Sequence, residues 1–330
     1  MSIVLGIEST AHTFGVGIVR DGNILVNVRD MYTTETGGII PIESAKHHAN
    51  VSHELYAKAL EISGIKEKDI DAVAFSQGPG LAPCLLEGIK FAKEISLKLR
   101  IPLVGVNHCV SHLEVGKVTG AKDPVMLYAS GANTQVIAYA SGKYRIFGET
   151  LDIGVGNFID NFARYAGIGF PGGPKIEQLA KNGKYIELPY KVKGMDIALS
   201  GILTNLKQKI ESGKYSLEDL SYSLQETVFA MLVETAERAL AHTGKKELLL
   251  GGGVACNSRL QEMCKIMCKE RGAKFFCPEK SLLVDNGAMI AYLGEVMFKS
   301  KSNIYSGEQI KNADIYPTER TDDVEVEWKN

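Results

Sequence analysis

The sequence predicts an α/β protein of two duplicated lobes with a cleft between them. The chain has 330 residues, which is long enough for two domains. A pattern of strand, small-residue polar loop, strand and hairpin opens the chain and returns about 120 residues later. Amphipathic helical segments alternate with short apolar strands elsewhere, which is typical of α/β folds. We expect one lobe over residues 1–124 and the other over 125–295, with a segment of about 296–330 packing back on the first.

Two hairpins carry the duplication. The stretch IVLGIESTAHTFGVGIVRDGNILVNVRD places Asp21-Gly22 between apolar strands, and VMLYASGANTQVIAYASGKYRIFGET places Ser141-Gly142 at the equivalent point. Both dipeptides favour a tight hairpin turn.

The remaining elements follow from hydrophobic periodicity. We expect helices over 41–64, 85–99, 216–244, 258–271 and 285–298, and strands over 71–80, 101–107 and 247–253. His47, His48 and His53 lie along the first helix, where a polar or partner-facing surface is the favoured interpretation. The polar tail from about Lys299 has no strong periodicity, and we expect part of it to be mobile.

Composition excludes several classes of protein. A formal charge of −2 excludes a strongly basic nucleic-acid binder over the whole chain, although residues 141–215 hold 11 Lys and Arg against 7 Asp and Glu. No apolar run approaches the roughly 18–20 residues that span a membrane. The N-terminus has no basic leader, so we expect a cytoplasmic protein with reduced cysteines. Cys264 and Cys268 suit the core face of a helix better than a metal site.

The stretch GVNHCVSHLEVG predicts a metal site. His108 and His112 lie four residues apart after a strand, so both imidazoles share one helix face. Further ligands must come from elsewhere, and Asp285, between an apolar run and a helix start, is a good candidate. Tyr128 is a weaker one. The protease motif HExxH is absent, because Cys109 follows His108.

Two polar loops at equivalent points of the duplication suggest anion binding. One lies around Ser9 and Thr10, and the other, SGANT, spans residues 130–134. Small polar residues expose backbone N–H groups that bind phosphate. Together the loops suggest a phosphate held between the lobes.

Two glycine-rich stretches indicate a nucleoside pocket. In LLLGGGVACNSRL, a strand ends at Gly251, Gly252 and Gly253, where a flat group can lie on the backbone. Asn257 either caps the next helix or bonds a ligand hydroxyl.

The stretch NFIDNFARYAGIGFPGGPKIEQLA holds two carboxylates that, taken alone, fit surface charges better than a binding site, although they also suit ribose hydroxyls. Asp160 lies in an expected helix, Gly172 and Gly173 form a turn, and Glu177 follows it. Carboxylates beside a glycine turn can accept hydrogen bonds from ribose hydroxyls. The GxxxxGK[ST] motif of phosphate-binding loops is absent from the sequence.

These motifs resemble a known family. GIEST, NHCVSH, YASGANTQ, GFPGGPKIE, GGGVACNSRL and VDNGAM occur in this order over about residues 1–297. Together they resemble the archaeal and eukaryotic-type threonylcarbamoyladenosine synthase, the catalytic subunit of the KEOPS complex, once described as a glycoprotein endopeptidase. The resemblance implies the actin-like, sugar-kinase and heat-shock ATPase fold.

The resemblance also implies a reaction and its site. The threonylcarbamoyl group passes from threonylcarbamoyl-AMP to N6 of the tRNA adenosine adjacent to the anticodon, in tRNAs that read codons starting with A. It implies one divalent metal, with iron favoured and zinc also compatible, held by His108, His112, Tyr128 and Asp285. The residues implied to contact the substrate are Tyr128, Ala129, Ser130, Gly131, Ala132, Asp160, Gly173, Glu177 and Asn257.

The implied partners are tRNA, a small atypical protein kinase that acts as an ATPase, and two small accessory proteins. In some archaea that kinase is fused after such a tail, so the chain can be part of a longer fusion. Glu8 stands where sugar kinases and heat-shock ATPases usually have Asp, which argues against simple ATP hydrolysis.

Three other functions remain open from the sequence. An ATP-dependent small-molecule kinase of the same fold would not need the histidine pair. A metallopeptidase would need the glutamate that is missing beside His108. A non-catalytic nucleotide-binding scaffold would keep the glycine pocket but tolerate the loss of His108 and Asp285.

Overall fold

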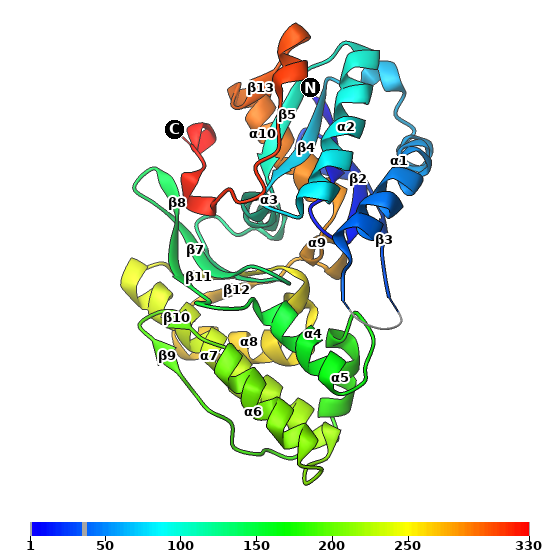
Figure 1. Ribbon diagram of the computed structural model, residues 1–330. Coiled ribbons are helices and arrows are strands. Elements are labelled where there is room, and N and C mark those ends of the chain that lie inside the picture. Colours follow the sequence, from blue (N-terminus) through cyan, green and yellow to red (C-terminus); the bar gives the residue numbers. More distant parts are fainter. Residues whose placement is uncertain (1, 35–37, 330) are drawn as a thin grey trace.

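Two β-sheets form the centres of the two lobes (Figure 1). The computed structural model describes residues 2–34 and 38–329. The first sheet has the order β13-β5-β4-β1-β2-β3, with strands β1 (Ile3–Glu8), β2 (Thr13–Arg20), β3 (Asn23–Met31), β4 (Ala72–Gly78), β5 (Leu103–Asn107) and β13 (Ile304–Tyr305). The second has the order β12-β11-β6-β7-β8, with strands β6 (Val125–Ala129), β7 (Thr134–Ala140), β8 (Lys143–Glu149), β11 (Glu247–Gly251) and β12 (Lys274–Phe276).

The predicted duplication is confirmed by topology. In each sheet three antiparallel strands form a meander, and the first of them pairs in parallel with a later strand, β4 in one sheet and β11 in the other. The two hairpin turns share a backbone conformation: φ is 46° and 78° at Asp21 and Gly22, and 51° and 79° at Ser141 and Gly142. Two successive positive φ values match the twist of a tight hairpin.

The helices form layers around the sheets. In the first lobe these are α1 (Pro41–Ser63), α2 (Ala82–Leu99), α3 (His108–Val115) and α10 (Gly287–Ser300). In the second they are α4 (Val155–Tyr165), α5 (Gly173–Ala180), α6 (Ser200–Glu211), α7 (Leu217–Thr243), α8 (Ser258–Glu270) and the short α9 (Lys280–Leu283). A separate two-stranded sheet of β9 (Val192–Lys193) and β10 (Asp196–Ile197) lies beside the second sheet, where β10 contacts β8.

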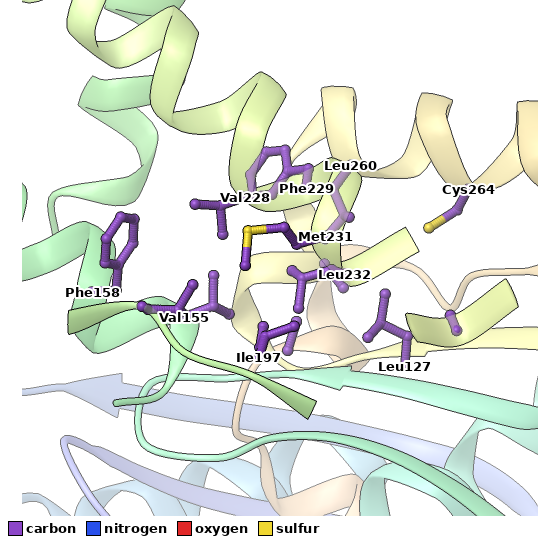
Figure 2. Packing of buried hydrophobic residues seen from close by; sticks show 14 of the residues in the cluster. Leu127, Val155, Phe158, Ile197, Val228, Phe229, Met231, Leu232, Leu260 and Cys264 are labelled. Carbon is purple, nitrogen blue, oxygen red and sulfur yellow. The ribbon is translucent and has the colours of Figure 1, made fainter. Parts of the chain in front are cut away.

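Successive side chains along each strand point to opposite faces of the sheet, so they pack against different helices. In β1, Leu5 and Ile7 pack with α1 and α2, whereas Val4 faces α10 on the opposite side of the sheet. Figure 2 shows Leu127 of β6 facing Met231 and Leu232 of α7. Helices α3 and α10 therefore lie in one apolar cluster between the two sheets, which we call the inner core. It includes Val4, Val106, Val110, Leu113, Tyr128, Tyr144, Leu249, Met289 and Val326.

The cysteines of α8 are part of the outer core of the second lobe. Cys264 and Cys268 are buried in the same apolar cluster as Leu260, and Figure 2 shows Cys264 pointing toward the sheet. This confirms the core interpretation of the cysteine pair. Burial raises the pKa of the Cys264 thiol, which keeps it protonated.

The C-terminal part of the chain returns to the first lobe. Helix α10 contacts β1, β2 and β4, and β13 pairs with β5. The predicted boundary at residue 295 falls inside α10, so we propose that the first lobe takes up the chain again at the start of this helix. Ile310, Ala313 and Val326 of the tail are buried, so the tail packs at these residues, and mobility of another part of it stays a prediction. None of the helices in the described ranges is long and apolar enough to cross a membrane.

His48 departs from its predicted surface position. Its side chain is fully buried against Phe14, and Nε2 lies 3.0 Å from the carbonyl oxygen of Ala11. The prediction of a polar or partner-facing surface is therefore wrong for His48, although His53 on the same helix is exposed.

Acid is expected to destabilise the protein through His48. Burial lowers the pKa of His48 from 6.5 to about 4. Between these pH values the unfolded chain binds more protons, so the free energy of unfolding falls as pH falls, by at most about 3 kcal/mol. Urea unfolding at several pH values tests this. His48→Gln should flatten the slope and His53→Gln should not; parent and His48→Gln curves of equal slope would contradict the prediction.

Candidate active site

Helix α3 presents both predicted histidines to the space between the sheets. It begins directly after β5, where the side chain of Asn107 caps it by accepting from the Val110 N–H over 3.1 Å. The imidazoles of His108 and His112 lie on successive turns with their ring centres 4.9 Å apart, and both residues are buried. The spacing of four residues therefore places them on one face, as predicted.

Asp285 faces both histidines from the segment that precedes α10. Its Oδ1 lies 3.4 Å from Nε2 of His108 and 3.4 Å from Nε2 of His112. One ligand atom from each of the three residues lies within 4.8 Å of the others. Two imidazole nitrogens and a carboxylate oxygen suit a divalent transition metal.

Tyr128 approaches the same point from the second sheet. It lies near the end of β6, fully buried, with its ring centre 5.1 Å from that of His112. Within the described residues, neither the Tyr128 hydroxyl nor Nδ1 of His112 has a hydrogen-bond partner. Buried polar atoms without partners are costly, so these two atoms fit a site built for a further ligand.

The charges of the site are strongly coupled. Burial lowers the pKa of His108, but Glu8 and Asp285 outweigh it, and the net pKa lies well above its usual range. Burial also raises the pKa of Asp285, but the neighbouring histidines outweigh this and hold it well below its usual range. Burial lowers the pKa of His112. The carboxylate is thus ionised, and His112 stays neutral and ready to act as a ligand.

Glu8 is a member of the site that sequence reasoning did not assign. It ends β1 and is fully buried, and its Oε2 accepts from Nδ1 of His108 over 3.0 Å. A carboxylate on the far ring nitrogen fixes the orientation of a ligand histidine. The available signal was a charged residue that directly ends a buried strand.

The predicted anion loop at Ser9 and Thr10 is turned inward. Both residues are buried, the Ser9 N–H donates to Ser76 Oγ over 3.0 Å, and the Thr10 N–H donates to Glu8 Oε1 over 2.7 Å. These N–H groups already have partners. We propose that the loop supports Glu8 and His108 instead of holding a phosphate.

The equivalent loop of the second lobe is open. Gly131 and Ala132 are exposed, and Ser130 is partly exposed. The loop rests on the start of α4, where the Gly156 N–H donates to the Ser130 carbonyl over 2.9 Å. Its backbone therefore remains accessible beside Tyr128.

The three-glycine turn lies against this open loop. Gly252 has φ of 87°, and a Cβ there would meet the Ala129 carbonyl oxygen at 2.4 Å, so only glycine fits. At Gly253 an added Cβ would meet nothing closer than Val284, at 3.9 Å. Gly251 ends β11 beside Tyr128. Gly251 and Gly252 are buried, so within this turn the accessible backbone is that of Gly253.

The other residues predicted to bind the nucleoside make separate hydrogen bonds at the starts of α5 and α8. Asp160 lies in α4 and accepts from the Gly172 N–H over 2.8 Å. Glu177 in α5 accepts from the Ser258 N–H over 2.8 Å. Asn257 caps α8 and donates to Gln225 Oε1 over 2.6 Å, so the capping role is the one seen here. At Gly173, the first residue of α5, an added Cβ would meet no atom within 4 Å.

Comparison with known proteins decides the family. The family model described as TsaD, tRNA N6-adenosine threonylcarbamoyltransferase, matches residues 23–292. A tRNA N6-adenosine threonylcarbamoyltransferase of Thermococcus kodakarensis is 57% identical over 327 residues, covering 99% of both chains. The chain belongs to this threonylcarbamoyltransferase family. A probable bifunctional tRNA threonylcarbamoyladenosine biosynthesis protein of Methanosarcina mazei is 54% identical over 333 residues, which cover 99% of this chain and 60% of that protein.

Solved structures confirm the fold predicted for this threonylcarbamoyltransferase-family chain. HypF of T. kodakarensis matches with a TM-score of 0.64 at 16% identity, over 90% of this chain and 48% of HypF. The (R)-2-hydroxyglutaryl-CoA dehydratase component A of Acidaminococcus fermentans matches with a TM-score of 0.55 at 14% identity, over 89% and 98%. These likenesses concern the fold alone, and the two-lobed actin-like architecture is confirmed.

Neutralising Glu8 is expected to weaken metal binding by this threonylcarbamoyltransferase-family protein. Glu8→Gln keeps the shape of the side chain but removes the charge that orients His108, so the zinc dissociation constant should rise by about 10-fold. Competition with a chromophoric chelator measures it. Glu43→Gln, at an exposed position of α1, is the control. Equal zinc affinity in parent and Glu8→Gln would show that Glu8 does not orient the ligand.

Proposed function

We propose that this chain transfers the threonylcarbamoyl group of threonylcarbamoyl-AMP to N6 of the adenosine adjacent to the anticodon, in tRNAs reading codons that start with A. The metal would be held by His108, His112, Tyr128 and Asp285. The observation that carries the proposal is that three of these residues face one another within 4.8 Å, with the open loop of residues 130–132 beginning directly after β6, the strand that carries Tyr128.

Neighbouring segments support placing the whole donor here. The loop of residues 130–132 begins two residues after Tyr128, Gly252 packs against the backbone of Ala129, and the loop bonds to the start of α4, the helix that holds Asp160. The loop N–H groups suit the phosphate, whereas Asp160 and Glu177 supply acceptors for ribose hydroxyls. Gly173 and Gly253 leave space for the adenine or ribose.

The chemistry requires positioning more than a covalent nucleophile. The N6 lone pair of adenine is delocalised into the ring, so the amine is a weak nucleophile. A bound metal would supply Lewis-acid polarisation of the acyl donor. The carbonyl carbon forms a bond to N6, its bond to the phosphate oxygen breaks, AMP leaves and N6 gives up a proton. Glu8 would keep His108 oriented, and the loop after Tyr128 would hold the phosphate.

The finer assignments rest on chemistry and resemblance. We propose iron as the metal, with zinc also compatible with these ligands. We propose a complex of the KEOPS type, with a small atypical kinase and two small accessory proteins, because a chain with net charge −2 needs help to hold tRNA. A cytoplasmic location follows from the tRNA substrate. The longer bifunctional relative is consistent with a partner activity joined to such a chain.

Blocking the proposed pocket tests where the nucleotide binds. Gly173→Val and Gly253→Val add bulk where a Cβ meets open space, so the fold should persist while the AMP dissociation constant rises by about 10-fold or more. Calorimetric titration of AMP measures this. Gly201→Val, at an open position of α6, is the matched control. AMP affinity that is unchanged in both pocket variants would place the nucleotide elsewhere.

A further inference from the structure

The C-terminal segment runs between α3 and the β7–β8 hairpin. In Figure 1 it is the red segment that passes between the first lobe and the tip of this hairpin. It contains two 3-10 turns, η5 (Thr321–Asp323), which contacts β8, and η6 (Glu327–Lys329), which contacts α10. None of this segment lies within residues 23–292, which match the family model.

One contact of this segment reaches the start of α3. Oε2 of Glu319 accepts from Nδ2 of Asn107 over 2.7 Å. Asn107 is the residue whose other side-chain atom, Oδ1, caps α3 through the Val110 N–H. Glu319 therefore fixes the side chain that starts the helix, one residue before His108.

A second set of contacts reaches the end of α3. Glu114, in the last turn, is fully buried and accepts from the indole N–H of Trp328 over 3.4 Å. Its carboxylate also pairs with Lys329 at 3.6 Å and accepts from the Tyr144 hydroxyl of β8. The Lys329 ammonium lies 4.7 Å from the Tyr144 ring centre, a cation–π distance.

The middle of the segment is fixed to the second sheet. The Thr321 hydroxyl donates to Oε1 of Gln135 in β7 over 3.2 Å, and this bond is buried. Val326 is buried in the inner core, and Trp328 packs against it. The segment thus contacts both ends of α3 and the sheet that carries Tyr128.

We propose that residues 319–329 form a positioning strap that fixes α3, and with it His108 and His112, relative to Tyr128 and Asp285. Glu319 and Glu114 are positioning residues in this arrangement. The inference rests on the metal site proposed above. Helix α3 has only eight residues, and so short a helix depends on tertiary contacts for its placement. A small rotation of it would move both imidazoles away from the carboxylate of Asp285.

Variants of the full chain separate positioning from bulk stability. Glu319→Ala removes the acceptor for Asn107, whereas Glu319→Gln retains an oxygen that can accept the same bond. Trp328→Phe keeps a packed ring but removes the N–H that donates to Glu114, so it tests the other end of α3 without depending on Glu319. Glu325→Ala is the matched control, because Glu325 lies in the strap but makes only an exposed ion pair with Lys143.

The first readout is zinc affinity of metal-free protein, measured with zinc alone well below the melting temperature. Glu319→Ala should raise the zinc dissociation constant by about 10-fold, the lower end of the effect seen for residues that orient ligands. Glu319→Gln should recover most of the affinity, Trp328→Phe should weaken it in the same direction, and Glu325→Ala should match the parent.

The second readout is transfer from preformed threonylcarbamoyl-AMP to tRNA, with the partner proteins present. Displaced ligands should lower kcat in Glu319→Ala more than they raise KM for tRNA. A merely structural strap would lower the melting temperature and leave zinc affinity and kcat at parental values, which would overturn the inference. A parent that binds neither zinc nor ferrous iron would instead overturn the proposed metal site.

Discussion

Asp285→Ala is expected to reduce threonylcarbamoyl transfer by at least about 100-fold, because it removes a carboxylate that faces both histidines. Without this residue, His108 and His112 would lose the oxygen atom that lies 3.4 Å from Nε2 of each ring. Metal affinity should fall together with transfer, because both depend on the same oxygen.

Single-turnover transfer with preformed threonylcarbamoyl-AMP measures the effect, and zinc titration measures the binding. Glu187→Ala, at an exposed acidic position, is the control for general effects of charge. Asp285→Asn keeps an oxygen ligand but loses the charge, so its transfer rate and zinc affinity should lie between those of the parent and of Asp285→Ala. Parental transfer by Asp285→Ala would mean that the histidine pair and this carboxylate do not form the reactive centre.

Gly17→Ala is expected to destabilise the fold by about 3 kcal/mol or more, because α10 lies directly on the first sheet. A Cβ at Gly17 would lie 2.3 Å from the backbone nitrogen of Ala288, and one at Gly6 would lie 2.2 Å from that of Ala291. Both contacts are with backbone, so no side chain can rotate away. The helix itself would have to move.

This displacement should also reach the metal site. Asp285 immediately precedes α10, so a shift of the helix start changes the position of its carboxylate relative to His112. Denaturant unfolding gives the loss of stability, and zinc titration of the folded fraction gives the loss of affinity. Gly201→Ala, where an added Cβ meets open space, should change neither. Parental stability in Gly17→Ala would contradict the close packing of α10.

Local patterns carried much of the fold. The strand periodicity and the Asp21-Gly22 and Ser141-Gly142 turns were sufficient to predict two equivalent meanders, because hairpin conformation depends on the residues in the turn itself. The spacing of His108 and His112 was likewise sufficient to predict that they share one helix face, because that spacing is also a local property of the sequence. Helix α6 and the β9–β10 pair were not predicted, since their short segments lack a strong period.

Features that depend on distant segments were harder to predict. Helix α10 can pack directly on the first sheet because positions 6 and 17 are glycines. This role of the two glycines cannot be recognised from the sequence before the helix is placed against the sheet. Glu8 was noted as a departure from related ATPases, but its bond to His108 spans 100 residues of sequence. The tail lacks periodicity because it packs through single contacts such as that of Glu319 with Asn107.

We propose that this chain transfers a threonylcarbamoyl group at a metal site formed by His108, His112 and Asp285. The most direct test is to incubate the protein and its partners with preformed threonylcarbamoyl-AMP and unmodified tRNA, once with metal-loaded protein and once after the metal has been removed. The tRNA nucleosides are then identified by mass. We predict threonylcarbamoyladenosine with the metal-loaded protein, little after metal removal, and recovery when metal is added back. Equal yields before and after complete removal of metal would contradict the claim.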